Sequence, residues 1–139
     1  MNWKRLDYNP DIIYHYTKKE NVKNILQDKK IKKFKDSYTF FTKSYDDAIY
    51  LINNVTCNPK CVTIGFDGIK RVNKNNPKDY VILKLEVDKN YIDRTKWFIS
   101  SSASGINQER IQKINDSICY KGDLKFKSCE ILNGEHDET

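Results

Sequence analysis

The clearest structural signal in the chain is YVILKLEV at positions 80–87, which predicts a β-strand because apolar, aromatic and β-branched residues fill most of its positions. Other segments share this enrichment and are bounded by polar or turn-forming residues. They predict further strands at 12–17 (IIYHYT), around Phe40 and Phe41, at 61–66 (CVTIGF) and at 126–132 (FKSCEIL). The polar segment 67–79 is expected to be a loop.

A short helix is predicted directly after the strand at 12–17. Thr17 and Glu20 have the spacing of a capping box, in which a hydroxyl and a carboxylate satisfy free N–H groups of the first helical turn. The apolar stripe of this helix consists of Val22, Ile25 and Leu26. We expect the helix to end near Asp28 or Lys29.

A second helix is predicted after the next strand, again from a capping pattern, Ser44 followed by Asp47. Its inward stripe is expected to consist of Ala48, Leu51 and Ile52. The pairs Asn53-Asn54 and Asn58-Pro59 favour turns and predict its end. A third helix is expected over 108–118.

The order of these elements is strand, helix, strand, helix and then mostly strands. This order differs from the regular alternation of a doubly wound sheet, and the sequence holds no Gly-rich phosphate-binding loop. An α+β fold is therefore predicted, and 139 residues suit one domain spanning 1–139. The acidic residues 135–139 are expected to form a disordered tail.

The positive charge of the chain is concentrated at one end. The net charge is +6, and residues 1–35 alone carry +6, from ten lysines and arginines and four acids. A basic face of this kind suits an anionic partner such as nucleic acid, although a lysine-rich segment can equally be a solvated helix face. No apolar run reaches the length of a signal peptide or a membrane span. We therefore expect a cytoplasmic protein without membrane contact.

Two titratable residues stand out because apolar residues surround them in the sequence. His15 lies between two tyrosines in a predicted strand, where it is either a hydrogen-bonded core histidine or a functional one. Glu130 lies in the last predicted strand, where regular alternation groups it with Phe126 and separates both from Cys129. If the face of Glu130 is buried, the carboxylate must be paired, protonated or functional. If the strand lies at an edge, Glu130 faces water.

The cysteines do not indicate a metal site or disulfides. They are Cys57, Cys61, Cys119 and Cys129. Their spacing is loose, no histidine lies near any of them, and nothing in the sequence indicates export to an oxidising compartment. We expect no bound metal.

Three segments, taken in order, resemble the ADP-ribosyltransferase superfamily, specifically its His-Tyr-Glu branch. YHYTKKENVKNILQDKKIK is similar to the first strand and helix of that branch, TFFTKSYDDAIY to its second strand and following helix, and KFKSCEIL to the strand that bears the catalytic acid. Together they cover about 40 of the 139 residues. The resemblance implies a split β-sandwich with short flanking helices, which clamps NAD in the cleft between two sheets.

The resemblance also implies roles for individual residues. His15 would serve binding and catalysis by holding a ribose hydroxyl of NAD with help from Thr17, and Tyr50 would stack on nicotinamide. Glu130 would be the catalytic acid, because a fixed carboxylate stabilises the oxocarbenium-like state formed as nicotinamide leaves. The remaining predicted NAD-binding residues are Tyr16, Phe40, Thr42 and Ser44.

Some positions depart from the pattern of that branch or leave alternatives open. Phe40 stands where the tyrosine of the His-Tyr-Glu pattern is expected, and Tyr38 lies nearby. Glu109 is a rival to Glu130 as the catalytic acid. The candidates for contact with the NAD pyrophosphate are Arg5, Arg71, Arg94 and Arg110. The segment Ser100–Gly105 is either an acceptor-binding loop or a connector.

By this resemblance we expect a monomeric, NAD-dependent ADP-ribosyltransferase that modifies a protein, a nucleic acid or a ribonucleoprotein. Family analogy suggests a bacterial toxin or a phage effector directed against host defence, such as an anti-CRISPR protein. One alternative is an inactive relative that binds nucleic acid or a protein partner, with salt-sensitive binding and no NAD turnover. Another is an RNA 2′-phosphotransferase-like enzyme, which would need several arginines converging on a phosphate.

Overall fold

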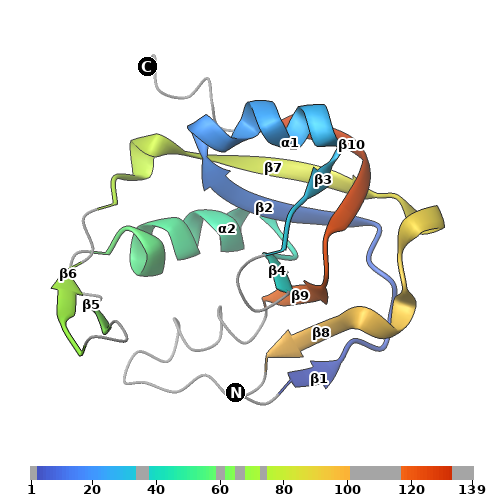
Figure 1. Ribbon diagram of the computed structural model, residues 1–139, viewed down its shortest axis with the longest axis horizontal. Coiled ribbons are helices and arrows are strands. Elements are labelled where there is room, and N and C mark those ends of the chain that lie inside the picture. The colour runs from blue at the N-terminus through green and yellow to red at the C-terminus, as the bar shows by residue number, and fades with distance from the viewer. Residues whose placement is uncertain are drawn as a thin grey trace.

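In the part of the chain that it describes, the computed structural model shows an α+β fold with two four-stranded antiparallel sheets, a two-stranded hairpin and two short α-helices (Figure 1). The described residues are 3–33, 38–58, 62–64, 68–72, 75–100 and 117–132. The predicted α+β class is confirmed. Within these ranges no helix is long and apolar enough to cross a lipid bilayer. The tail 135–139 and most of the predicted helix 108–118 and of the segment 100–105 lie outside the described residues.

The first sheet is built around the strand that the sequence shows most clearly. Its order is β2 (Ile12–Lys18), β7 (Tyr80–Val87), β10 (Leu124–Ile131) and β3 (Lys30–Ile31). β7 has the predicted bounds, and it pairs along the whole of β2, from Ile12 opposite Glu86 to Lys18 opposite Tyr80. β2 therefore forms an edge of this sheet.

The second sheet includes the predicted strand around Phe40. Its order is β1 (Trp3–Arg5), β8 (Trp97–Ser100), β9 (Ile118–Lys121) and β4 (Tyr38–Phe41). β4 confirms the prediction and forms the edge opposite β1. Each sheet thus ends in a strand, β2 or β4, that carries residues singled out in the sequence.

The sequence patterns missed or misplaced several short strands. The predicted loop 67–79 contains β6 (Lys70–Val72), which pairs with β5 (Val62–Ile64). The predicted helix 108–118 overlaps β9 at Ile118, which is a strand residue. The sequence did not predict β1, β3 and β8. Strands of two to four residues are too short to show the alternation of apolar and polar residues that indicates a strand.

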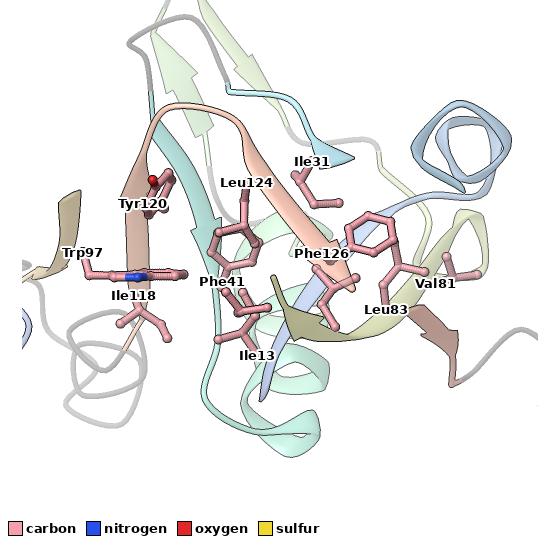
Figure 2. Close-up of a cluster of buried hydrophobic side chains, with 12 residues drawn as sticks. Ile13, Ile31, Phe41, Val81, Leu83, Trp97, Ile118, Tyr120, Leu124 and Phe126 are labelled. Atoms are coloured by element: carbon pink, nitrogen blue, oxygen red, sulfur yellow. The ribbon is translucent and has the colours of Figure 1, made fainter. Parts of the chain in front are cut away.

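The main hydrophobic core receives side chains from both sheets (Figure 2). Ile13, Leu83 and Leu85 of the first sheet are fully buried there. The second sheet contributes Phe41 and Trp97, whose ring centroids lie 6.1 Å apart. Full burial of one large apolar side chain stabilises a fold by about 1.5–3 kcal/mol. The core that the two sheets share therefore holds them together.

The second helix ends between the two asparagine-containing pairs that predict its end. α2 (Tyr45–Leu51) leads directly into a π-helical turn over Ile52–Thr56. Ala48 and Ile52 are buried in a second, smaller core that they share with β7, so the predicted inward stripe is confirmed. The π-helical turn includes Asn53-Asn54 and ends at Thr56, so that pair does not end the helix, whereas Asn58 follows its C-cap, Cys57, as predicted.

The two predicted capping patterns had different outcomes. Ser44 caps α2 as predicted, since its hydroxyl accepts a 3.1 Å hydrogen bond from the backbone N–H of Asp47. The capping box at Thr17 is wrong, because β2 runs past Thr17 and a 3₁₀ turn, Lys19–Asn21, precedes the helix. The helix itself, α1 (Val22–Asp28), ends where it was predicted to end.

The regular alternation predicted for the last strand is interrupted in β10. The register of β10 with β7 shifts between Phe126 and Ser128, as in a β-bulge. This shift brings Phe126 and Cys129 to the same hydrophobic core, whereas regular alternation put them on opposite faces. Glu130 is exposed. The predicted grouping of Phe126 with Glu130 on one face is therefore wrong.

The edges of the two sheets meet at one position in the described part of the chain. Tyr14 of β2 and Thr42, just after β4, form an isolated antiparallel bridge. Each backbone N–H donates to the carbonyl of the other residue, at 3.0 and 2.8 Å. Beyond this bridge, residues 15–18 and 38–41 lie on the two sides of an opening.

Candidate functional site

A cavity of about 1000 Å³ lies where the edges of β2 and β4 separate. Residues 15–18 and 38–42 line its two sides. The rest of the described wall comes from the segment 21–32, from the end of α2 and the π-helical turn, and from Tyr80 and Ser117. Small-molecule and cofactor sites have volumes of about 300–1000 Å³, so this cavity is large enough for a cofactor.

His15 connects the two edges at the start of the cavity. Its Nδ1 donates a 2.8 Å hydrogen bond to the carbonyl oxygen of Phe40, and its ring centroid lies 5.5 Å from that of Phe41. Because a carbonyl can only accept, Nδ1 carries the proton, and Nε2 of the neutral ring is an acceptor. Burial lowers the pKa of His15, and the bond to Phe40 offsets part of this effect. At neutral pH, His15 can therefore accept a hydrogen bond from a ligand hydroxyl.

The backbone of β2 presents a second recognition element to the cavity. Tyr14 directs both its N–H and its carbonyl to Thr42. In an antiparallel strand such pairs of groups point to the same edge at every second residue, so Tyr16 directs its N–H and carbonyl to this edge as well. A donor and an acceptor side by side match a ligand carboxamide, which carries both kinds of group.

The side chain of Tyr16 joins β2 to the π-helical turn. Thr56 Oγ1 donates a 2.9 Å hydrogen bond to the Tyr16 hydroxyl, and the Tyr16 ring meets the Tyr80 ring edge-on at 6.3 Å. Burial raises the pKa of Tyr16, so its hydroxyl stays protonated at neutral pH. π-helical turns occur frequently at functional sites, and this one supplies Val55 and Thr56 to the cavity wall.

Thr17 and Thr42 line the cavity, but their hydroxyl groups make hydrogen bonds within the protein. Thr17 Oγ1 accepts a 3.1 Å bond from the side-chain amide of Asn21. Thr42 Oγ1 donates a 2.8 Å bond to the carbonyl of Ser44. Ser44 and Tyr50 do not belong to the described cavity wall. Ser44 serves as the cap of α2, and from the same helical segment Leu51, rather than Tyr50, lines the cavity.

Phe40 and Phe41 point to opposite sides of β4. Phe41 is buried in the main core, whereas the side chain of Phe40 is 47% exposed and Phe40 lines the cavity. Tyr38 shares the face of Phe40, because successive side chains of a strand alternate, and it also lines the cavity. On this face the Tyr38 ring meets the Phe98 ring edge-on at 6.2 Å.

The structure does not bring Glu130 to His15. Glu130 stands opposite Lys84 of β7, and His15 stands opposite the preceding residue, Leu83. Residues directly opposite each other share a face, and successive residues alternate, so Glu130 and His15 point to opposite faces of the sheet. Glu130 is not among the described lining residues, and the rival acid Glu109 lies outside the described part of the chain.

The part of the wall formed by residues 18–32 carries more positive than negative charge. Lys18, Lys30 and Lys32 line the cavity there, and Asp28 is the acid among the described lining residues. Lys32 pairs with Asp28 at 3.6 Å, and Lys30 pairs with Asp123 at 3.7 Å. The sequence shows that this segment is basic, but chain position alone does not show that it lies beside the cavity.

Other wall residues carried no functional prediction, because nothing in the sequence distinguishes them from ordinary polar or core residues. Examples are Asn21, Asn24, Leu51, Val55, Thr56 and Ser117. No arginine belongs to the wall that the structure describes. Arg5 lies in β1 and Arg94 in the 3₁₀ turn before β8, both in or beside the second sheet. Arg110 and the side chain of Arg71 lie outside the described residues.

Comparisons of the chain with known protein families, with curated proteins and with solved structures gave no match. The candidate site therefore rests on the geometry of the chain itself. That geometry combines a cavity of cofactor size, a neutral histidine acceptor, a strand edge with paired donor and acceptor groups, and a basic wall.

Proposed function

We propose that the chain is an NAD-dependent ADP-ribosyltransferase, with the split β-sandwich of that superfamily and NAD bound between β2 and β4. The observation that carries the proposal is His15, which is held across the gap by Phe40 with Nε2 as an acceptor. In the reaction, the bond between ribose C1′ and nicotinamide breaks, and nicotinamide leaves with the electron pair. An oxygen or nitrogen of a macromolecular acceptor bonds to C1′, and its proton passes to a base.

The described wall offers a complementary group to each part of NAD. The N–H and carbonyl of Tyr16 match the nicotinamide carboxamide, and His15 Nε2 accepts from a ribose hydroxyl. The exposed ring of Phe40 suits stacking on a planar base. Lys18 and Lys30 supply positive charge for the pyrophosphate, which removes the need for an arginine there.

The catalytic acid is the residue for which the resemblance and the geometry differ. The resemblance assigns Glu130, which is exposed on the opposite face of the sheet. The described wall contains Asp28, and it contains Ser117, which follows Asp116 in the sequence. A carboxylate must lie close to C1′ to stabilise the developing positive charge. Asp28 and Asp116 are therefore candidates to be tested beside Glu130 and Glu109.

The first experiment is incubation of the pure protein with NAD, alone and with cell lysate, with nicotinamide release and label transfer as readouts. His15→Gln should lower nicotinamide release about tenfold or more, because it removes the ring acceptor held across the gap. Asp28→Asn, Asp116→Asn, Glu109→Gln and Glu130→Gln are compared with Glu20→Gln, an exposed acid outside the wall of this cavity. Loss of release in one acid variant with an unchanged melting temperature identifies the catalytic acid. Wild-type protein that releases no nicotinamide refutes the proposed activity.

One alternative gains support from the position of Glu130. A binding module with this cavity, but without a catalytic acid, would bind NAD and release no nicotinamide. Nicotinamide release separates the two. Isothermal titration should show NAD binding, weakened by His15→Gln, in both cases, but only the enzyme turns NAD over. The RNA 2′-phosphotransferase-like alternative is disfavoured, since the described wall lacks the converging arginines that it needs.

A further inference from the structure

Residues 18–33, here called the basic rim, supply part of one side of the cavity wall. This segment runs from the last residue of β2 through the 3₁₀ turn, α1 with its C-cap Lys29, and β3 to the two lysines that follow β3 (Figure 1). It contains seven lysines and two acids, so +5 of the chain's net charge of +6 lies in it. Two of these lysines, Lys30 and Lys32, are in ion pairs. Three others are exposed and make no ion pair in the described part of the chain: Lys23, Lys29 and Lys33.

Lys29 occupies a backbone position where glycine is usual. It forms the C-cap of α1 with φ 54° and ψ 36°, which is the left-handed region. This region costs a residue with a side chain about 1–2 kcal/mol, and glycine avoids the cost. The rim thus carries a charged side chain at a position where an uncharged glycine is less strained.

An exposed aromatic residue belongs to the lining of the same cavity as part of the basic rim. Phe40 is 47% exposed and lines the cavity together with Lys18, Lys30 and Lys32. Proteins bind single-stranded nucleic acid by combining basic side chains, which contact the phosphates, with exposed aromatic rings. Any unpaired base can stack on such a ring. Duplex bases stay stacked on one another, and an acidic protein surface supplies no stacking bases. The combination therefore favours a single strand over both.

We propose that the basic rim binds single-stranded nucleic acid, DNA or RNA, with phosphates on its lysines and one unpaired base on Phe40. In the proposed transferase, this nucleic acid is the acceptor of ADP-ribose, so the transfer step rests on the proposed function. The binding step is independent of NAD. Base preference is weak, because residues 18–33 contain lysines but no arginine, which is the better reader of base edges.

The test is fluorescence anisotropy without NAD, using labelled oligothymidylate and oligouridylate of about 12 nucleotides, at about 50 and 200 mM NaCl. The rim variant carries Lys23→Gln, Lys29→Gly and Lys33→Gln, none of which lines the cavity. The matched control makes the same charge change in and beside the second sheet, with Lys4→Gln, Arg94→Gln and Lys96→Gln, all exposed.

The rim variant should bind about tenfold or more weakly at low salt, and its salt slope should fall by about 2, since each lost phosphate contact removes about 0.7. The control should keep its affinity within about twofold. Equal losses in the two variants, or wild-type protein that does not bind, overturn the proposal. Equally tight binding of a duplex, or competition by polyglutamate as strong as by oligonucleotide, overturns the choice of a single strand.

The stacking contact has its own matched pair of variants. Phe40→Ala should weaken oligonucleotide binding about fivefold or more, which is the effect of losing one base–aromatic stack. Tyr8→Ala removes a ring of equal exposure, 47%, that does not line the cavity, and it should leave binding unchanged. Equal effects of the two substitutions overturn the role of Phe40.

A second readout separates failure of this proposal from failure of the proposed function. Hydrolysis of NAD without nucleic acid should be the same in the rim variant as in the wild type, because none of its three positions lines the cavity. Label transfer to the oligonucleotide should fall together with binding. Oligonucleotide binding without NAD turnover supports the rim and refutes the transferase. NAD turnover with label transferred to lysate protein, but without oligonucleotide binding, supports the transferase and refutes the rim.

Discussion

Replacing Lys29 by glycine should stabilise the fold even though the residue belongs to the basic rim. At φ 54° a side chain costs about 1–2 kcal/mol. Glycine removes this cost, but it also makes the unfolded chain more flexible, which lowers the free energy of unfolding by about 0.4–1 kcal/mol. The backbone hydrogen bonds of Lys29, to the carbonyl of Ile25 at 2.9 Å and from the N–H of Phe126 at 3.3 Å, do not involve its side chain. The expected net gain is about 0.5–1 kcal/mol.

Lys29→Ala provides the comparison, because it loses the same charge but keeps Cβ in the left-handed region. Urea unfolding of both variants at neutral pH should give Lys29→Gly a free energy of unfolding about 1 kcal/mol above that of Lys29→Ala. A melting temperature about 3 °C higher is the corresponding thermal result. Equal unfolding midpoints for the two variants would refute the argument from backbone strain. Weaker oligonucleotide binding by a more stable Lys29→Gly would show that the charge serves the rim rather than the fold.

Three further predictions concern the core, the helix cap and the titration of His15. Leu85→Ala should lower the free energy of unfolding by about 2–5 kcal/mol, because Leu85 is fully buried in the main core; a loss below about 1 kcal/mol in urea unfolding contradicts this. Ser44→Ala should cost about 1 kcal/mol in the same assay and Ser44→Asp should restore it, since Asp47 N–H needs an acceptor; no difference between the two variants contradicts the cap. Because burial lowers the pKa of His15 below its ordinary 6.5, the unfolded state binds the proton more readily. The contribution of neutral His15 to the free energy of unfolding should therefore be fully present above about pH 6.5 and should fall as the pH drops towards the lowered pKa. His15→Gln should remove this part of the pH dependence. An identical pH profile of stability in both proteins contradicts the prediction.

The elements that could be predicted are those whose signals are local in the sequence. β7 carries its apolar residues in one nearly uninterrupted stretch, and Ser44 marks the start of α2 through a bond to a residue three positions later. The short strands β1, β8 and β9 depend on partners far away in the sequence, such as Trp3 opposite Ser100. No local pattern identifies such strands, because their stability comes from pairing and not from their own composition.

The sequence could predict the parts of the candidate site that lie on β2 and β4, but it could not predict the face to which Glu130 of β10 points. His15 and Phe40 both stand in strands that the sequence shows, and in the structure they share a hydrogen bond. Glu130 was assigned to the same site from the order of segments. The face to which a strand residue points depends on register and on bulges, and the shift at Phe126–Ser128 is not readable from one sequence.

The cavity exists because β2 and β4 pair at Tyr14 and Thr42 and then stop pairing, which leaves a strand edge of the kind that proteins normally cover. The side chain of His15 bonds to the carbonyl of Phe40 where the ladder would otherwise continue, and the backbone groups of Tyr16 remain directed to the gap. A ligand that bonds to both groups of Tyr16 would take the place of the missing strand. Bound NAD should therefore slow hydrogen exchange of the Tyr16 amide, and it should leave that of Tyr14, already bonded to Thr42, unchanged. Unchanged exchange at Tyr16 with saturating NAD would show that the open edge does not recognise the ligand.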